Sequence, residues 1–353
     1  MDDAAHASPA ARPPDVVDVA ALGESMVTFL PGRPGRLADV PSFDRAIGGA
    51  ESNVVCALAA FGHPVRWISR VGADGFGDHL VERIAGHGVD VSAVGRDPRR
   101  PTGVYFRTAG ERGTGAHEVA YYRAGSAASA MSADTVDLAA ADAARVLHLT
   151  GITAALSEPC RELARALTAP RAGRPLVSFD VNHRPGLWRD TDGGAILLEL
   201  ARRADIVFVG ADEAAQAWGV TGGPAAVRRL LPQPRLLVVK QGARGATAFA
   251  PGHPGGFFRP ALDTAVVAAT GAGDAFAAGF LSATLRGLPL AARLRHGHLF
   301  AAAALTAPGD LAPPPARDHA DRLAALDDGA WERLRLGPGW TQAERAPKEA
   351  NIP

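Results

Sequence analysis

The sequence predicts an α/β fold, a three-layer sandwich in which a mainly parallel sheet lies between two layers of helices. Short apolar runs rich in β-branched residues recur along the chain, and helix-like segments lie between them. The length of 353 residues fits two domains, or one large α/β domain with an appendage, at roughly 150 residues per domain. A chain of this length buries a full core without disulfides or metals.

Six apolar runs have the composition of strands buried on both faces of a parallel sheet. We expect them at residues 16–22, 65–71, 145–149, 176–180, 206–209 and 236–240. The helices between and after them are expected at residues 52–61, 76–87, 157–169, 195–203, 211–218, 225–231, 272–286 and 291–304.

Two stretches interrupt the alternation of strand and helix, and each is typical of a hairpin. Residues 26–30 pair with 37–43 in the first, and residues 103–108 pair with 117–123 in the second. The glycine-rich tip of the second, residues 109–115, is expected to be mobile. These strands, spanning about 26–43 and 102–123, predict a small β-sheet that covers the open edge of the main sheet as a lid.

The two ends of the chain differ in composition from its middle. Residues 1–14 hold three prolines and no apolar run, which predicts a disordered tail. Residues 15–310 form the main unit, and residues 311–353 are expected to hold a surface helix at 317–326 and a polar tail. The most apolar window, 266–285, contains Asp274 and three glycines, which argues against a membrane span.

Charge and cysteine content narrow the classes of function. The 37 basic and 37 acidic residues balance, whereas a dedicated nucleic-acid binder needs net positive charge to displace counterions. Two cysteines, Cys56 and Cys160, are too few for a disulfide framework and suit a reducing cytoplasm. No signal-peptide pattern opens the sequence, so a cytoplasmic location is expected. Lys240 and Lys348 are the two lysines, which leaves 35 arginines.

One short motif carries chemistry. The sequence has neither a Walker A loop nor a GxGxxG after its first strand, but residues 269–274 read Ala-Thr-Gly-Ala-Gly-Asp before an apolar helix-like run. A glycine turn into a helix presents free N–H groups and the positive end of the helix dipole, which together bind anions. Asp274 in the first turn is either a dipole-complementing acid or a base that takes a proton from a hydroxyl while the amides stabilise a phosphoryl group in transfer.

This motif, together with a second one near the N-terminus, resembles the signatures of the ribokinase-like (PfkB) carbohydrate kinases. Residues 270–276, Thr-Gly-Ala-Gly-Asp-Ala-Phe, match their C-terminal signature. Residues 48–53, Gly-Gly-Ala-Glu-Ser-Asn, with 58–62 and 71–72, match their N-terminal one. The two signatures lie more than 200 residues apart in the expected order, and the resemblance covers roughly residues 16–310. It implies the ribokinase-like fold with its lid, and a kinase that uses ATP and Mg²⁺.

The resemblance assigns roles to individual residues. Asp274 would be the base, and Gly271, Ala272 and Gly273 would form the anion hole. The nucleotide would lie against Asn182, Arg184, Lys240, Gly242, Gly245, Gly271 and Gly273. The alternative for Lys240 is a solvated lysine at a strand end.

Within that family the chain is most similar to 2-keto-3-deoxygluconate kinases. The similar stretches are residues 22–26, 49–53, 102–106, 121–127 and 179–188. Substrate contacts implied by the match are Gly49, Ala50, Glu51, Asn53, Tyr105, Tyr121, Arg123, Arg184 and Asp274. Arg123 and Arg184 suit an acidic sugar because a guanidinium binds a carboxylate with two parallel hydrogen bonds. Alternatives remain open: Arg123 as a solvated strand end, and the two tyrosines as lid packing.

Two positions depart from the family pattern. Ala268 stands where many members have an aspartate that helps to hold a monovalent cation, which puts potassium activation in doubt while backbone carbonyls still offer a site. Gly210 stands where an asparagine opens the motif that organises the magnesium water shell, and Glu213 retains its acid. Glu213 would hold Mg²⁺ through water, or is simply an acid at a helix start.

The expected activity is ATP-dependent phosphorylation of a sugar-acid hydroxyl, converting 2-keto-3-deoxygluconate to its 6-phosphate. One alternative is a kinase for a neutral sugar or nucleoside such as ribose, fructose or adenosine. Another is a non-catalytic sugar-sensing relative, which Ala268 and Gly210 favour and the retained Asp274 opposes. The expected partner is a small sugar or sugar acid, with no nucleic acid and no membrane, and the lid strands offer a surface for a homodimer.

Overall fold

A computed structural model describes residues 15–33, 35–108, 118–189 and 191–342 of the chain. The predicted tail at 1–14, the glycine-rich tip at 109–115 and the last residues of the predicted polar tail lie outside the described residues.

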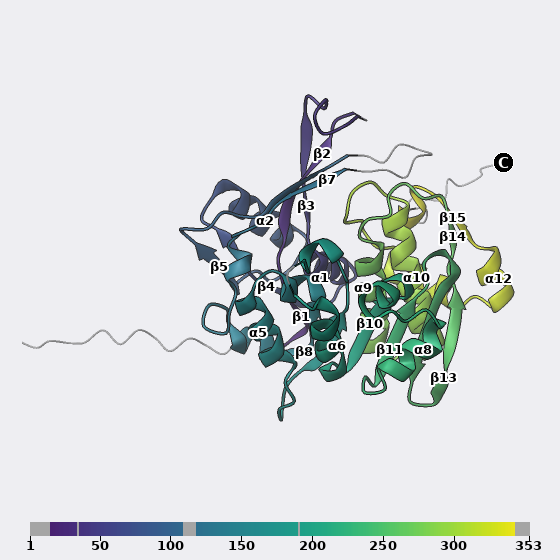
Figure 1. Ribbon diagram of the computed structural model, residues 1–353. Coiled ribbons are helices and arrows are strands. Elements are labelled where there is room, and N and C mark those ends of the chain that lie inside the picture. The colour runs from purple at the N-terminus through teal and green to yellow at the C-terminus, as the bar shows by residue number, and fades with distance from the viewer. Residues whose placement is uncertain (1–14, 34, 109–117, 190, 343–353) are drawn as a thin grey trace, which may run out of the picture.

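A central sheet of nine strands organises the molecule (Figure 1). Its order is β13-β12-β11-β10-β9-β8-β1-β4-β5, parallel from β11 to β5, with β12 and β13 antiparallel at one edge. The strands are β1 (Val17–Leu22), β4 (Val65–Gly72), β5 (Val94–Asp97), β8 (Ala144–Thr150), β9 (Leu176–Asp180), β10 (Ile206–Gly210), β11 (Leu236–Lys240), β12 (Gly245–Ala250) and β13 (His253–Pro260).

The six predicted strands are confirmed, each to within one residue at either end. The sequence reading missed β5, β12 and β13. The strand β13 contains Pro254, Gly255 and Gly256, which are depleted in strands and tolerated at a sheet edge. A short edge strand such as β5, with four residues, carries too few apolar positions for a pattern to appear.

Helices cover both faces of the sheet and create two separate cores, one on each side. Val19 and Ala21 of β1 point into one core, and Ala20 and Leu22 into the other. The first core is closed by α1 (Ala50–Ala60), α2 (Gly75–Gly86), α9 (Ala272–Leu285), α10 (Leu290–Leu305), α11 (Arg317–Ala324) and α12 (Asp328–Arg333). The second is closed by α3 (Leu138–Asp142), α4 (Gly151–Ala155), α5 (Glu158–Thr168), α6 (Gly193–Arg203), α7 (Ala211–Trp218) and α8 (Gly223–Leu230).

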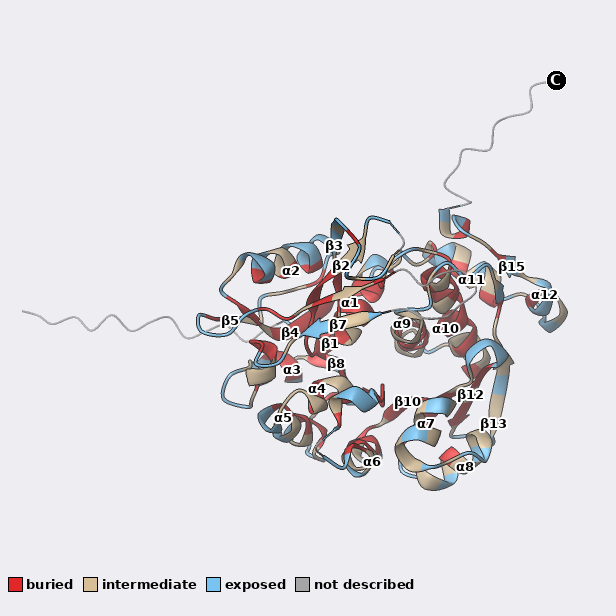
Figure 2. Ribbon diagram, turned by 45° about the horizontal axis from the view of Figure 1, so that its top comes forward, coloured by how far each residue is buried: buried red, intermediate tan, exposed pale blue. Residues whose placement is uncertain are grey.

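Burial follows these layers (Figure 2): the central strands and the inward helix faces are buried, and the outer helix faces are exposed. All eight predicted helices in the main unit are confirmed to within two residues at either end, and the helix expected at 317–326 ends at residue 324. The three-layer fold predicted from the sequence is therefore the observed one.

A second sheet of four strands stands over one end of the first, in the order β3-β2-β6-β7 (Figure 1). It comprises β2 (Met26–Pro31), β3 (Phe43–Gly48), β6 (Val104–Arg107) and β7 (Val119–Tyr122), and we call it the lid. The hairpin of β6 and β7 is as predicted. The parallel pairing of β2 with β6 joins the two hairpins into one sheet.

The predicted strand at residues 37–43 is wrong. The strand that pairs with β2 is β3, six residues further on, with Met26 opposite Gly48 and Pro31 opposite Phe43. Leu37 and Val40 supplied an apolar pattern, but they lie in the connection. The observed strand begins with Phe43, Asp44 and Arg45. A strand at a sheet edge with one face exposed to solvent does not need an apolar run.

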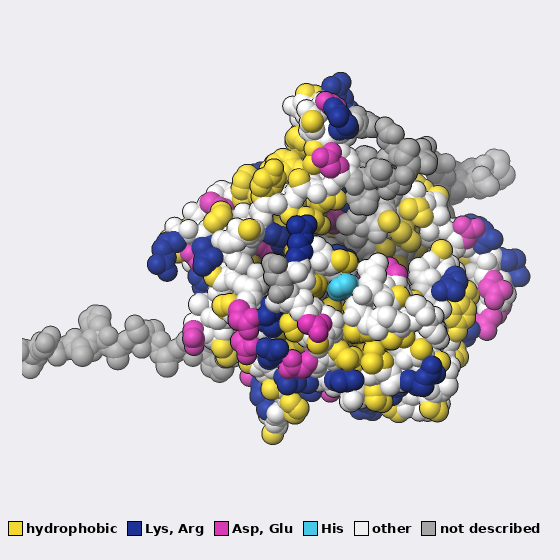
Figure 3. All heavy atoms as spheres, in the orientation of Figure 1, with side chains coloured by type: hydrophobic (Ala, Val, Ile, Leu, Met, Phe, Trp, Pro, Cys, Tyr) yellow, Lys and Arg dark blue, Asp and Glu magenta, His cyan; other side chains and the backbone are white. Residues whose placement is uncertain are grey.

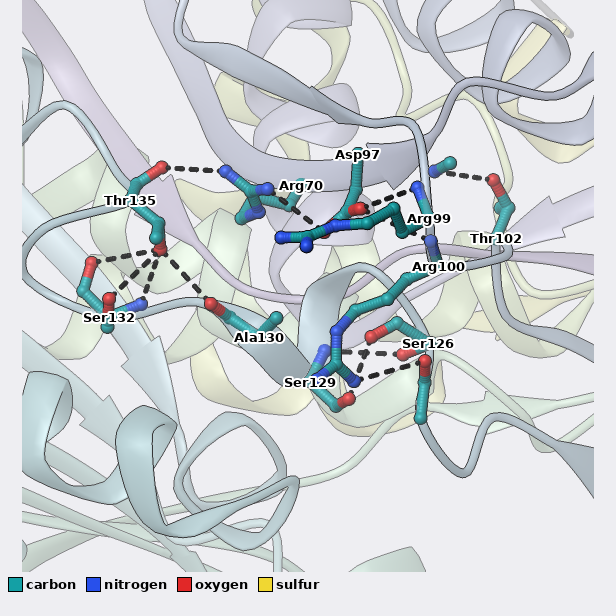
Figure 4. Close-up of polar contacts among 12 residues, drawn as sticks. Arg70, Asp97, Arg99, Arg100, Thr102, Ser126, Ser129, Ala130, Ser132 and Thr135 are labelled. Carbon is teal, nitrogen blue, oxygen red and sulfur yellow. Dashed lines mark hydrogen bonds and ion pairs between the residues drawn. The ribbon is translucent and has the colours of Figure 1, made fainter.

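Polar contacts fix the loops that lead into and out of the lid (Figure 4). The carboxylate of Asp97, at the end of β5, accepts hydrogen bonds from the backbone N–H groups of Arg99 and Arg100 and from the guanidinium of Arg70. The hydroxyl of Thr102 accepts a hydrogen bond of 2.9 Å from the N–H of Gly72. The start of β6 is thereby tied to the ends of β4 and β5.

The chain beyond α10 packs back onto the first core. Trp331 of α12 and Trp340 are both buried. A two-residue strand, β15 (Arg335–Leu336), pairs with β14 (Asp263–Thr264). Among the described residues, no helix has the length and apolar character needed to cross a membrane.

Candidate active site

The carboxyl ends of three neighbouring strands place polar residues side by side. The register aligns Phe208 with Asp180, and Gly210 with Lys240, so that β9, β10 and β11 end at the same edge of the sheet. This edge faces the start of α9. Ligands of open α/β sheets bind in this position, outside the carboxyl ends of the strands.

The turn into α9 can exist only with glycine at its first position. Gly271 has a φ of 78°, in the left-handed region, and a Cβ there would lie 2.1 Å from the carbonyl oxygen of Asp310. The N–H groups of the following first turn have no acceptor inside the helix. Gly271, Ala272 and Gly273 therefore form the turn at which the sequence predicts anion binding, and we call it the anion-binding turn.

Asp274 lies in that first turn and is held from the other side by α1. The side-chain amide of Asn53 donates a hydrogen bond of 2.9 Å to Oδ2 of Asp274. These two residues lie 221 positions apart in the chain, and the packing of α1 against α9 brings them together. The N-terminal and C-terminal signatures thus meet at one carboxylate.

The surroundings of Asp274 raise its pKa from 3.8 to about 7. Loss of hydration is the largest cause, and the negative charge of Asp180 adds to it. The hydrogen bond from Asn53 and the positive charges of Lys240 and Arg184 oppose the rise. A carboxylate whose pKa lies near neutral pH is suited to act as a general base.

Lys240 is held beside the anion-binding turn. Its ammonium Nζ lies 2.7 Å from Oδ2 of Asp180, and the side chain of Lys240 is 18% exposed. Burial works to lower the pKa of Lys240, but the carboxylates of Asp180 and Glu213 outweigh burial and the pKa is raised. Lys240 is therefore a charged, paired residue of the site, and the alternative of a solvated strand-end lysine is excluded.

The lid reaches the anion-binding turn through Arg107. One nitrogen of Arg107 donates to the hydroxyl of Thr270 at 2.6 Å, and another lies 2.7 Å from Oδ1 of Asp310. The hydroxyl of Tyr105 donates to the other oxygen of Asp310. A Cβ at Gly48 would lie 2.4 Å from that tyrosine hydroxyl, so Gly48 leaves room for it.

The sequence reading missed Arg107 and Asp310. Asp310 follows a Pro-Gly pair after α10, and Arg107 lies two residues beyond Tyr105 on β6. The alternation of a strand puts Arg107 on the same face as Tyr105, and this periodicity was the available signal. For Asp310 the sequence alone gave no signal, because its partners come from a strand more than 200 residues earlier.

Arg123 is also enclosed, with 11% of its side chain exposed, so it is not a solvated strand end. Its guanidinium forms an ion pair with Glu24, which accepts a further hydrogen bond of 2.6 Å from the hydroxyl of Ser126. It lies 5.9 Å from the ring of Tyr121, whose ring is 5.4 Å from that of Tyr105. The lid thus brings both tyrosines and Arg123 together, with part of the guanidinium already used by Glu24.

Glu51 lies in the first turn of α1, and its buried Oε2 has no hydrogen-bond partner among the described residues. Its Oε1 accepts hydrogen bonds from the hydroxyls of Thr150 and Thr153, at 2.8 and 2.7 Å. Burial raises its pKa, and a Cβ on Gly23 would collide with its carboxyl group. Its contacts among the described residues link α1 to the end of β8.

Gly49 and Ala50 begin α1 at the foot of the lid. Gly49 is the residue before the helix, and a Cβ on it would lie 2.5 Å from the carbonyl oxygen of Glu24. This close approach brings the start of α1 against the segment between β1 and β2. Asn53 projects from the same helix one turn later and reaches Asp274.

Asn182 and Arg184 follow β9 at the same edge of the sheet. Asn182 has a φ of 42°, in the left-handed region, and its buried Oδ1 has no hydrogen-bond partner among the described residues. Arg184 is exposed, and its guanidinium lies 3.5 Å from Oε1 of Glu213. Gly242 and Gly245 flank the turn between β11 and β12 beyond Lys240, both at positive φ.

Glu213 closes the first turn of α7. Its Oε2 accepts a hydrogen bond of 2.7 Å from the N–H of Gly210. Loss of hydration raises its pKa, and Lys240 opposes the rise. One oxygen of Glu213 is therefore used at the start of α7, and the other faces Arg184 at the carboxyl edge of the sheet.

Comparison with known proteins agrees with this geometry. The family model described as pfkB family carbohydrate kinase matches residues 17–317. The chain belongs to the PfkB family of carbohydrate kinases. The family and the enzyme class predicted from the two signatures, a phosphotransferase with an alcohol group as acceptor, are thereby confirmed.

Curated relatives include two kinases of the same sugar acid. The 2-dehydro-3-deoxygluconokinase of Thermoproteus tenax is 37% identical over 77% of this chain and 83% of its own length. That of Bacillus subtilis (strain 168) is 34% identical over 86% and 94%. A probable chloroplastic fructokinase-6 of Arabidopsis thaliana is 32% identical over 80% and 75%.

Solved structures share the fold. A PfkB protein from Polaromonas sp. JS666 is 35% identical, with a TM-score of 0.77 over 88% of this chain and 100% of its own. A putative ribokinase II from E. coli in complex with ATP and Mg²⁺ is 23% identical, with a TM-score of 0.77 over 87% and 98%. The ribokinase-like architecture with its lid sheet is thus the fold of this protein.

Proposed function

We propose that this protein transfers the γ-phosphoryl group of ATP to a hydroxyl of a sugar acid, and that the substrate is 2-keto-3-deoxygluconate, phosphorylated at its 6-hydroxyl. The observation that carries the proposal is Asp274, a partly buried carboxylate with a pKa of about 7, in the first turn after an anion-binding glycine turn. An acid beside an anion site is what phosphoryl transfer to an alcohol requires.

The chemistry follows from these two parts. Asp274 accepts the proton of the sugar hydroxyl, and the resulting oxygen attacks the γ-phosphorus in line while the bond to the ADP oxygen breaks. The N–H groups of the first turn of α9 and the ammonium of Lys240 stabilise the negative charge on the phosphoryl oxygens. Asn53 fixes the orientation of Asp274 through its hydrogen bond.

The residues at the strand ends fit a hydrated cation with a triphosphate. The buried Oδ1 of Asn182 lacks a hydrogen-bond partner in the part of the chain that the structure describes. Glu213 adds a carboxyl group at the same edge. Magnesium bound with ATP would neutralise phosphate charge, and Glu213 would hold it through water. Arg184, Gly242 and Gly245 complete the nucleotide side of this proposal.

On the sugar side we assign Tyr105, Tyr121 and Arg123 from the lid, together with Gly49 and Ala50 at the foot of α1. A guanidinium binds a carboxylate strongly, which favours a sugar acid. Glu51 anchors the start of α1 on the sugar side by accepting hydrogen bonds from the hydroxyls of Thr150 and Thr153. Asp310, which binds both Tyr105 and Arg107, joins the sugar side.

A neutral sugar is the second candidate, and one observation favours it. Arg123 already pairs with Glu24, so a carboxylate substrate has to share this guanidinium. The similarity to a fructokinase points the same way.

A coupled assay of ADP release tests both candidates. Sugar acids, neutral sugars and nucleosides are each offered with ATP and Mg²⁺, with and without potassium. We expect turnover with 2-keto-3-deoxygluconate; turnover with ribose or fructose alone would reject the sugar acid. No turnover with any member of the panel would support the non-catalytic alternative. The potassium arm decides whether Ala268 abolishes cation activation.

A further inference from the structure

Asp180 and Lys240 form an ion pair that the proposed chemistry does not by itself require. They end β9 and β11, on either side of β10, and their charged atoms meet at 2.7 Å across the end of that strand. Asp180 is almost wholly buried, with 2% of its side chain exposed. Burying a carboxylate costs free energy unless a charged partner compensates for it. Lys240 supplies that compensation for Asp180.

The ammonium of Lys240 also lies beside the anion-binding turn. Its Nζ lies 3.4 Å from the position that a Cβ on Gly273 would take. Gly273 directly precedes Asp274, so the ion pair adjoins the acid that takes the proton. An ammonium is a compact charge, whereas a guanidinium is a larger planar group.

Composition indicates that this position demands a lysine. Of the 37 basic residues, 35 are arginine, and the one other lysine, Lys348, lies outside the described residues. In a chain that uses arginine almost everywhere, lysine stands at the position whose cation lies beside Gly273.

Four polar or charged groups act on Asp274, from α1, β9, β11 and the loop after β9. Asn53 on α1 donates a hydrogen bond to it, Asp180 at the end of β9 repels its charge, and Lys240 at the end of β11 attracts it. Arg184, after β9, attracts it more weakly. Glu213 on α7 acts on Lys240 and keeps that lysine charged.

We propose that Asp180 and Lys240 are a positioning pair: Asp180 holds the ammonium beside the Gly273 backbone, and the two charges act in opposite directions on the ionisation of Asp274. The inference rests on the proposed role of Asp274 as base. It adds that Asp180 is no contact of sugar or nucleotide and works through Lys240 and Asp274.

The test removes the charges one after the other. In Asp180→Asn, Glu213 keeps Lys240 charged, and the repulsion between the carboxylates of Asp180 and Asp274 is removed. The acidic limb of the profile of kcat/KM against pH should therefore move to lower pH by about 1 pH unit. Adding Lys240→Met to Asp180→Asn also removes the attraction between the ammonium and Asp274. In this double variant the acidic limb should lie at higher pH than in Asp180→Asn alone. A role in stability alone lowers kcat without moving the limb. An unmoved limb, or an upward shift in Asp180→Asn, overturns the proposal.

Lys240→Arg is the matched control for size. It retains the charge, so we expect the acidic limb to stay within about 0.3 unit of the wild-type value while kcat falls at least 10-fold, because the guanidinium displaces the turn. Wild-type kcat in this variant would refute the claim that the position needs lysine. If Asp180→Asn does not fold, as judged by circular dichroism, Asp180→Ser replaces it because it also removes the carboxylate.

A second readout separates this proposal from the proposed function. We measure the unfolding free energies of the wild type and of Asp274→Asn without ligands at a series of pH values. The pH dependence of their difference gives the midpoint at which Asp274 ionises. Placed in the Asp180→Asn background, that midpoint shifts downward if the pair acts as proposed. This result holds even if the wild type phosphorylates no sugar, in which case the proposed function alone has failed.

Discussion

The proton on Asp274 links stability to activity. Its pKa is raised from 3.8 to about 7 in the folded protein, so folding binds this proton more tightly than the unfolded chain does. The stability that results is fully present below pH 3.8 and is lost as the pH rises through 7. The ionised form of Asp274, which acts as the base, therefore lowers the free energy of unfolding at neutral and alkaline pH. Such a loss of stability is common for residues of active sites.

Asp274→Asn should abolish phosphoryl transfer and stabilise the protein at alkaline pH. We expect turnover to fall by about 10²- to 10⁴-fold while the sugar still binds, because the base is lost and the hydrogen-bonding shape is kept. The gain in unfolding free energy should be near zero at pH 4 and grow to at most about 4 kcal/mol by pH 8.

Urea unfolding at several pH values, with calorimetry of sugar binding, measures these effects. A stability difference between Asp274→Asn and the wild type that is constant from pH 4 to 8 would contradict the assigned pKa. In the wild type, kcat/KM should fall as the pH drops below about 7.

Arg123 decides between an acidic and a neutral substrate. Because Arg123→Ala alone would leave Glu24 without its cation, the informative variant combines Arg123→Ala with Glu24→Gln. We expect kcat/KM for 2-keto-3-deoxygluconate to fall by about 30-fold or more, and that for a neutral sugar to change little. Glu24→Gln alone is the control. Equal losses with both substrates would show that Arg123 only supports the lid.

At the scale of residues, sequence reasoning predicted the groups whose role is local. Asp274 and the glycine turn were predictable because a helix start, its dipole and its free amides lie within a few consecutive residues. The pairs of Arg123 with Glu24 and of Arg107 with Asp310 were not, because 99 and 203 positions separate their members. Glu51 lay in a matching motif, but only the packed structure shows its two threonine partners.

At the scale of elements, the start of α2 is tied to the lid. Asp74 caps α2 by accepting hydrogen bonds from the N–H groups of Phe76 and Gly77. The same carboxylate accepts from the N–H and the hydroxyl of Thr102, just before β6. One side chain thus fixes both a helix of the main domain and the entry to the lid.

Asp74→Ala should therefore weaken both stability and sugar binding. We expect a loss of about 1 kcal/mol in unfolding free energy from the missing cap, together with a higher KM for the sugar because β6 is less well fixed. Asp137→Ala is the matched control: Asp137 caps α3 through the N–H of Ala140, away from the lid. It should cost similar stability and leave KM unchanged. An unchanged KM in Asp74→Ala would show that the lid does not depend on this contact.

The elements that the sequence predicted well are those buried on both faces or along one stripe. Their composition follows from burial alone, as in β10 and β11, and no partner has to be known. Three of the strands it missed, β3, β5 and β13, lie at sheet edges. β3 and β13 each have a face open to solvent and owe their position to a neighbouring strand, so their own residues carry little signal.

At the scale of the whole molecule, the lid leaves an aromatic surface on the side opposite Tyr105. Phe29 stacks on Phe106, whose other neighbours are Phe43 and Tyr122. The registers place these four aromatic residues on one face of the lid. Tyr122 is 66% exposed, and Figure 3 shows hydrophobic side chains gathered over the lid and α2.

We expect this surface to pair with that of a second copy, which would make the protein a dimer through the lid strands. An apolar face on a thin four-stranded sheet gains stability from cover, and β3 and β7 add open edges for strand pairing. Sedimentation velocity at micromolar concentration should report twice the chain mass of 36.4 kDa. Tyr122→Glu should give the monomer, because it places a charge in the contact. Phe258→Glu, on the distant β13, is the control and should stay dimeric. A monomeric wild type, or a dimer that survives Tyr122→Glu, would show that this face is not a dimer contact.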